Sequence, residues 1–268
     1  MSNDINYAAF FGFHSVAAAV VFAVLYVPLS AWFIHQSIRR PTYVFVVMAV
    51  FCTIRITAYT IRALLAGQES LGENLSLLIA DEILFGVGFF GLLYSAYTLV
   101  LDRESLLDVP KRTGIISRLT RSRRIFRLAM TIAIVLGITG TSEATSSNPS
   151  TVSTAHTLRK ISTIIFLVLT VLQAYQTMIL VRSERSVGFK NGNDSWGAQH
   201  GGYILYIISL LLLVREAFLI ATIGNQTRQN DEAFWYPLVA TPEVIAAMMY
   251  AIPGLVPPRS ELPQVGGM

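Results

Sequence analysis

Seven stretches of this chain are long and apolar enough to cross a lipid bilayer, and this pattern constrains the fold more than any other feature. A spanning α-helix needs about 20 mostly apolar residues. Backbone polar groups find no partners in hydrocarbon, so such stretches must form helices. The sequence therefore predicts an all-α membrane protein with a single bundle of seven transmembrane helices. The expected spans are 8–33, 43–65, 75–101, 126–141, 161–181, 202–224 and 235–253, in a domain of residues 1–256 with a short tail of residues 257–268.

The composition agrees with this class. Of the 268 residues, 53% are hydrophobic and only 13% are charged, whereas a soluble domain carries roughly a quarter charged residues. The single cysteine, Cys52, lies in an apolar run, which excludes a disulfide framework and a multi-cysteine metal site. The net charge of +4 is explained by loop topology and does not indicate nucleic-acid binding. We expect no cleavable signal peptide before the first span, which is expected to act as its own targeting signal.

The positions of the lysines and arginines predict the orientation, because short cytoplasmic loops are enriched in them. Fourteen fall on one side of the predicted bundle and three on the other, with three more inside spans. This places the N-terminus outside and the C-terminus in the cytosol. The fourth span is the shortest, and every later span would reverse if it did not cross. Eight of the fourteen lie between the third and fourth spans, where they can also attract anionic lipid or dock a cytosolic partner.

The predicted outer loops support this orientation. Residues 142–155 are rich in Ser and Thr and are expected to form a flexible, solvated loop. Asn225 begins an N-glycosylation sequon on the outer side, and Asn74 begins a second that abuts the third span. The protein is therefore expected to be a glycoprotein of the plasma membrane or an endomembrane. Trp235, Tyr236, Trp32 and Phe33 lie at span ends and are expected to form interfacial belts.

Ionisable residues inside the spans are the main candidates for function, because charge in hydrocarbon is costly and usually faces a bundle interior. All of them fall in the outer half of the bilayer or at mid-depth, so they can share one cavity. The spans contain three arginines and four carboxylates, so one carboxylate is left without an arginine partner. We expect Glu243, which follows the helix-distorting Pro242, to be that unpaired group and to carry a proton or contact a ligand. The predicted cluster consists of Arg55, Tyr59, Arg62, Asp81, Glu82, Arg215, Glu216, Glu243 and His14.

A structural alternative stands beside this interpretation. Arginine–carboxylate pairs can simply clamp helices together, and His14 can be an ordinary interfacial residue. Gly86, Gly88 and Gly91 in the third span indicate close helix approach. The sequence has no Walker motif, no HExxH metal site, no lysine in the seventh span and no aspartate-rich diphosphate site. No cofactor and no metal are therefore predicted.

Five segments resemble a family of fungal seven-helix integral membrane proteins of unknown function. They are YVPLSAWFIHQSIRR, FCTIRITAYTIR, ILFGVGFFGLLYSAYTL, LLLVREAFLIATI and LVATPEVIAAMMYAIPG. The chain is more loosely similar to fungal lipid-translocating exporter-like proteins linked to aminocholesterol resistance. It departs from these where Pro242-Glu243 replaces an expected aspartate. The resemblance implies an association with secondary-metabolite gene clusters.

The leading functional hypothesis is a pocket that binds or translocates a hydrophobic small molecule, either a lipid or a fungal metabolite. The first alternative is a metal-free intramembrane enzyme, similar in layout to small terpene cyclases. In that case Glu243 or Asp81 would protonate the substrate, and Tyr59, Tyr94 and Tyr250 would stabilise a cation. The second alternative is a seven-helix receptor. The expected partners are the lipid bilayer and a hydrophobic small molecule, and the oligomeric state stays open.

Overall fold

The computed structural model describes residues 6–107, 122–146, 148–187 and 195–258, and it is helical with no strand in those ranges. Six helices are long and apolar enough to span a membrane, so the protein is an integral membrane protein. They are α2 (Val16–Arg39), α3 (Tyr43–Gly67), α5 (Leu75–Leu106), α7 (Arg123–Glu143), α8 (Pro149–Val187) and α10 (Gly201–Ala221). The short helices are α1 (Tyr7–Phe10), α4 (Glu69–Gly72), α9 (Trp196–Gln199) and α11 (Gln226–Gln229).

A seventh helical segment is divided by a local change of helical pitch. It consists of α12 (Glu232–Trp235), the π-helix η1 (Tyr236–Ala240) and α13 (Thr241–Tyr250), which follow one another without a break. Pro242 has no backbone N–H to donate, and the Thr241 N–H bonds to the Tyr236 carbonyl five residues back. Such π-bulges are frequent beside functional sites.

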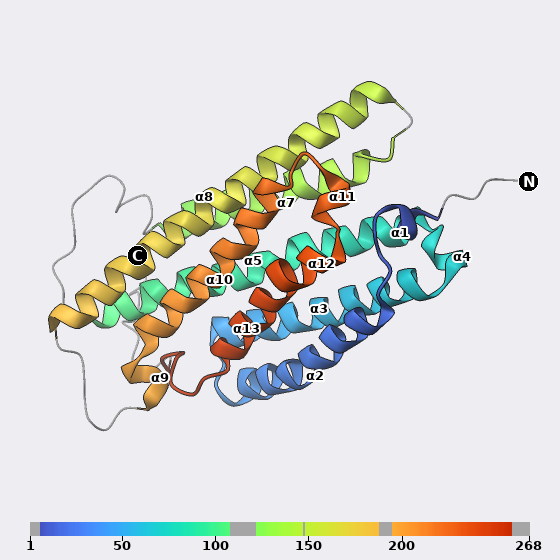
Figure 1. Ribbon diagram of the computed structural model, residues 1–268. Helices are drawn as coiled ribbons and strands as arrows, with labels where there is room; N and C mark the ends of the chain where they lie inside the picture. Colours follow the sequence, from blue (N-terminus) through green and yellow to red (C-terminus); the bar gives the residue numbers. More distant parts are fainter. Residues whose placement is uncertain (1–5, 108–121, 147, 188–194, 259–268) are drawn as a thin grey trace, which may run out of the picture.

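The long helices run alternately between two ends of the bundle (Figure 1). We call one the α1 end, which holds α1, α4, α11 and the connection from α7 to α8, and the other the α9 end. Glu232 fastens the seventh segment to the first at the α1 end, since its carboxylate accepts the backbone N–H groups of His14 and Ser15 at 2.9–3.1 Å. Large apolar residues such as Val20, Val24 and Val135 are exposed on the outside, where a membrane protein meets lipid.

The first predicted span begins too early. Residues 7–10 form the separate helix α1, and the chain then turns at Gly12, whose φ of 89° suits glycine. Ser15 caps α2 by accepting the Ala18 N–H at 3.2 Å. His14 consequently lies in an exposed turn before α2 and not inside a span.

The predicted flexible loop at residues 142–155 is also wrong, because α7 continues to Glu143 and α8 begins at Pro149. Threonine hydroxyls of α8 donate to carbonyls four residues back, as Thr154 does to Ser150 at 3.0 Å, which satisfies them within a helix. Gly140 allows α7 to approach closely, since a Cβ there would lie 2.8 Å from the Ala155 carbonyl oxygen. The C-terminal end of α5 also differs from the prediction, because the helix extends beyond residue 101 to Leu106. The charged residues in this extension are paired, Asp102 with Arg123 and Arg103 with Glu184.

Some expectations fall outside the ranges that the structure describes. These are most of the basic connection between the third and fourth spans, residues 108–121, and residues 259–268 of the predicted tail. The belt assignment is wrong for Trp235, Tyr236 and Phe33, which are buried, while Trp32 is partly exposed. Trp235 packs inside the bundle because its ring lies against the Arg62 guanidinium.

Candidate functional site

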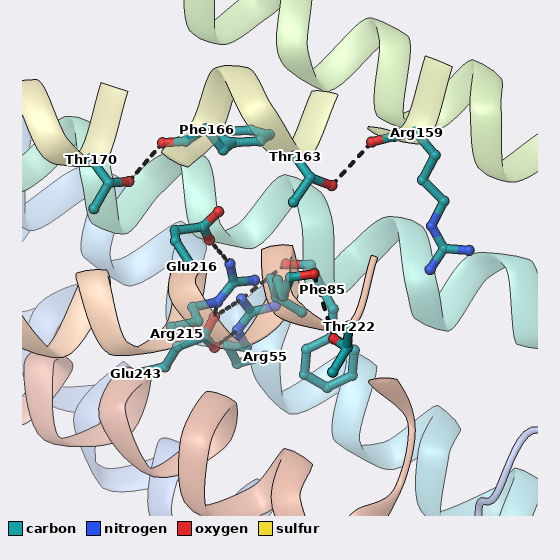
Figure 2. A network of polar contacts seen from close by, with 11 residues as sticks. Arg55, Phe85, Arg159, Thr163, Phe166, Thr170, Arg215, Glu216, Thr222 and Glu243 are labelled. Atoms are coloured by element: carbon teal, nitrogen blue, oxygen red, sulfur yellow. Dashed lines mark hydrogen bonds and ion pairs between the residues drawn. The ribbon is translucent and has the colours of Figure 1, made fainter. Parts of the chain in front are cut away.

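Glu243 lies at the centre of a buried network of charges (Figure 2). Its Oε1 accepts hydrogen bonds from Arg55 Nη2 at 2.8 Å and from Arg215 Nε at 2.6 Å. Arg215 also donates through Nη1 to Glu216. Arg55 Nε and Glu243 Oε2 are 2.8 Å apart as an ion pair, although their alignment completes no hydrogen bond. This network joins α3, α10 and α13.

The surrounding helix backbone is shaped to receive Arg55. Its guanidinium donates to the carbonyls of Leu84 at 3.1 Å and Phe85 at 3.0 Å on α5. A Cβ at Gly88 would lie 2.7 Å from Arg55 Nη1, so any larger residue there would force the guanidinium to shift. The expectation of close helix approach is confirmed for Gly91, whose Cβ would lie 3.2 Å from Val47 on α3, whereas Gly88 makes room for an arginine side chain. Gly86 differs, because nothing lies within 4 Å of its Cβ position.

Arg62 and Asp81 form a second buried pair nearer the α1 end. Arg62 donates to Asp81 Oδ2 through Nη2 at 2.6 Å and through Nε at 3.1 Å. The Arg62 guanidinium also lies over aromatic rings, 3.9 Å from the centroid of Trp235 and 4.3 Å from that of Phe85. Cation–π contacts of this kind stabilise a desolvated cation.

Arg159 of α8 pairs with Glu82 of α5, with 3.1 Å between Nη1 and Oε2. Sequence reasoning missed Arg159 because it placed this residue in an outer loop. A helical pattern was available, since Arg159, Thr163, Phe166 and Thr170 recur at three- and four-residue intervals along one side of α8 (Figure 2).

These pairs overturn the expectation that Glu243 is the unpaired carboxylate. Glu243 has two arginine partners, and Arg159 supplies the missing fourth cation. Four arginines, Arg55, Arg62, Arg159 and Arg215, therefore balance four carboxylates, Asp81, Glu82, Glu216 and Glu243. Pairing removes much of the free-energy penalty of placing each charge in a medium of low dielectric.

A cavity lies beside this network, lined mainly by residues of α5, α7, α8, α10 and the seventh segment. The centre of a water molecule can move through about 140 Å³ of it, far more than the roughly 10–15 Å³ that one buried water needs. Its charged lining residues are Arg62, Glu82, Arg159, Arg215 and Glu216, and its aromatic lining residues are Phe85, Phe89, Phe166 and Trp235. The ring centroids of Phe89 and Phe166 are 5.7 Å apart at the floor. The cavity occupies the α1 half of the bundle.

The predicted cluster thus divides into residues that line the cavity and residues that support them. Arg62, Glu82, Arg215 and Glu216 line it. Asp81 and Glu243 lie behind as partners of Arg62 and Arg215, and Arg55 pairs in turn with Glu243. Tyr59 is fully buried and packs against Phe22 and Phe85 instead. His14 does not join the cluster because it precedes α2. The cavity residues that sequence analysis did not assign to the cluster include Arg159, Gln229, Asn230 and Trp235.

The remaining predicted residues occupy the surface or other contacts. Asn225 and Asn74 are exposed at the α1 end, and Asn74 caps α5 by accepting the Ser76 and Leu77 N–H groups. Within the part of the chain that the structure describes, no three His, Cys, Asp or Glu side chains are grouped so as to hold a metal ion. Arginine keeps its proton in proteins, so the cavity offers fixed donors together with the carboxylate acceptors of Glu82 and Glu216.

The chain matches a family described as a domain of unknown function, DUF7702, over residues 14–192. The protein belongs to the DUF7702 family. The matched DUF7702 region contains Arg55, Arg62, Asp81, Glu82 and Arg159, whereas Arg215, Glu216 and Glu243 follow it. No curated protein and no solved structure matches the chain. The DUF7702 match establishes kinship and assigns no activity.

Proposed function

We propose that this protein binds a hydrophobic small molecule in the cavity between α5, α7, α8, α10 and the seventh segment. The cavity itself carries the proposal: it is an aromatic-lined space with a few convergent polar groups inside a membrane domain. Ligand sites in proteins commonly combine these two features. A lipid or a secondary metabolite, the two classes expected from the sequence, has the apolar body that such a lining accepts.

The form of the cavity favours exchange of the ligand at the α1 end. Its lining includes Gln229 and Asn230 from the connection between α10 and α12, which lies at that end. Phe89 and Phe166 close the opposite side. Translocation across the whole membrane would therefore require these two rings to separate, whereas binding and release at one face require no such movement.

We place the α1 end outside the cell or in an organelle lumen. The basic residues Arg39, Arg40, Arg123 and Arg185 lie at the α9 end, and positive charge favours the cytoplasmic side. Labelling tests this directly once the single cysteine is removed by Cys52→Ala. A membrane-impermeant maleimide should then label Arg40→Cys once the plasma membrane is selectively permeabilised. It should label Asn225→Cys in intact cells, or, for a protein in an organelle membrane, only after all membranes are dissolved. The reverse pattern would invert the assignment.

Binding is tested by filling the cavity. Gly86 lines it and has no other atom within 4 Å of its Cβ position, so Gly86→Leu adds a side chain that takes up part of the cavity. Gly224→Leu is the matched control, because Gly224 also has open space but lies outside the cavity. Hydrophobic compounds that co-purify from a fungal host should be found by mass spectrometry with the wild type and Gly224→Leu, and should be lost with Gly86→Leu. Equal recovery from all three proteins would refute the proposal.

No observation favours the enzyme alternative over binding. Its two named acids, Glu243 and Asp81, are held by arginines behind the cavity. Tyr250 donates its hydroxyl to the Leu92 carbonyl at 3.0 Å, and Tyr94 packs against Tyr43 and Phe90. These tyrosines are likewise absent from the lining, so they are poorly placed to stabilise a cation there.

A further inference from the structure

The chemistry of the ligand can be narrowed from two features of the cavity wall: its balance of charge and one unsatisfied amide. We infer that the ligand is uncharged and presents a hydroxyl or carbonyl oxygen to Asn230. This inference rests on the proposed binding function and specifies what the cavity accepts.

The charge balance argues for a neutral ligand. Each cation of the lining has a carboxylate partner: Arg159 has Glu82, Arg62 has Asp81, and Arg215 has both Glu216 and Glu243. A carboxylate or an ammonium group on the ligand would have to displace one of these partners or remain unpaired. Either outcome leaves an uncompensated charge in an apolar interior, which is strongly unfavourable. An uncharged ligand disturbs none of the pairs.

Asn230 supplies the specific contact. It lines the cavity and is only 7% exposed, yet its Nδ2 has no hydrogen-bond partner among the residues that the structure describes. A buried amide group without a partner is costly, and native proteins rarely leave one. A ligand oxygen within the cavity would satisfy this donor. If the amide were rotated so that its oxygen faced the cavity, a ligand hydroxyl would still fit, because a hydroxyl both donates and accepts hydrogen bonds.

The rest of the wall fits the body of such a ligand. Phe85, Phe89, Phe166 and Trp235 provide aromatic surface, and Ile83, Val87, Ile134 and Leu219 provide aliphatic surface. Asn230 lies at the α1 end, whereas Phe89 and Phe166 lie at the floor. The ligand therefore enters with its apolar part toward the floor and its oxygen toward the connection between α10 and α12.

The test uses four probes that share one ring system and differ only in the polar group: naphthyl methanol, naphthyl methyl ketone, naphthoate and naphthylmethylamine. Binding to the full-length protein in lipid nanodiscs is measured by the fluorescence anisotropy of the naphthyl group. The alcohol and the ketone should bind roughly 100-fold more tightly than the anion and the cation, given the penalty for an unpaired buried charge. Asn230→Leu, which keeps the side-chain size, should weaken the alcohol and the ketone about tenfold, as expected for one net hydrogen bond.

Controls separate this inference from the binding function itself. Arg228→Leu, an exposed neighbour in the same connection, should leave all four affinities unchanged. If no probe binds the wild type, or if Gly86→Leu binds them equally well, the proposed function fails. Suppose instead that naphthoate or naphthylmethylamine binds the wild type as tightly as the alcohol does, and that Gly86→Leu abolishes this binding. The cavity would then be a binding site, and only the inference that its ligand is uncharged would be overturned. Unchanged binding in Asn230→Leu would overturn the role of Asn230.

Discussion

Removing the charge of Glu243 tests the central network most directly. In Glu243→Gln the side chain keeps its size, but Arg55 and Arg215 are left with a single carboxylate, Glu216. One positive charge then stays uncompensated in a site where Glu243 and Arg55 are fully buried. Breaking a buried ion pair by removing one partner costs about 3–5 kcal/mol, at least a hundredfold in the unfolding equilibrium constant.

The assay is equilibrium unfolding of the purified protein in mixed micelles, followed by tryptophan fluorescence. Glu69→Gln is the matched control, because Glu69 is exposed in α4, and it should stay within about 0.5 kcal/mol of the wild type. Adding Arg55→Gln to Glu243→Gln restores neutrality and should recover a large part of the lost stability. Glu243→Gln with the stability of Glu69→Gln would show that Glu243 is not ionised and paired, and the charge-balance argument would fall with it.

Four further substitutions are compared by thermal unfolding in the same micelles. Gly140→Ala should destabilise the protein by about 1–3 kcal/mol, since its Cβ would lie 2.8 Å from the backbone oxygen of Ala155. Gly86→Ala should be neutral or gain up to about 1 kcal/mol of stability from helix propensity. Equal stability of these two variants would contradict the packing described for the two glycines. Glu232→Ala should lose about 1–2 kcal/mol, because two backbone N–H groups before α2 lose their acceptor; no change would mean that this contact does not form. Arg159→Met should lose about 1–2 kcal/mol, less than Glu243→Gln, because Arg159 is 21% exposed; a larger loss than in Glu243→Gln would reverse the ranking of the two pairs.

Local signals explain which boundaries were predictable. The start of α5 at Leu75 follows an asparagine cap and agrees with the prediction. The start of α2 was misplaced because residues 8–13 are as apolar as the helix itself, and hydropathy does not detect a turn at Gly12. The start of α8 was misplaced because Ser and Thr are typical of loops, whereas here they satisfy their hydroxyls within the helix.

The sequence by itself determined the class of the protein and the location of its charges. About 20 apolar residues in a row have no stable form in hydrocarbon other than a helix, and charge among them must face the interior. Arg55, Tyr59 and Arg62, which follow one another at four- and three-residue intervals, accordingly lie together on the buried face of α3. These conclusions depend only on local sequence and on the properties of the bilayer.

Only the tertiary structure decided which charges pair and where space remains. Glu243 looked unpaired because Arg159 was assigned to a loop, and only the packing of α8 against α5 brings Arg159 to Glu82. Gly86 and Gly88 are two residues apart and of the same type, yet one borders the cavity and the other borders an arginine. Partner choice and cavities depend on how the faces of several helices meet, and residues far apart in the chain control that geometry. The periodicity of a single helix fixes which face turns inward, but not what it meets there.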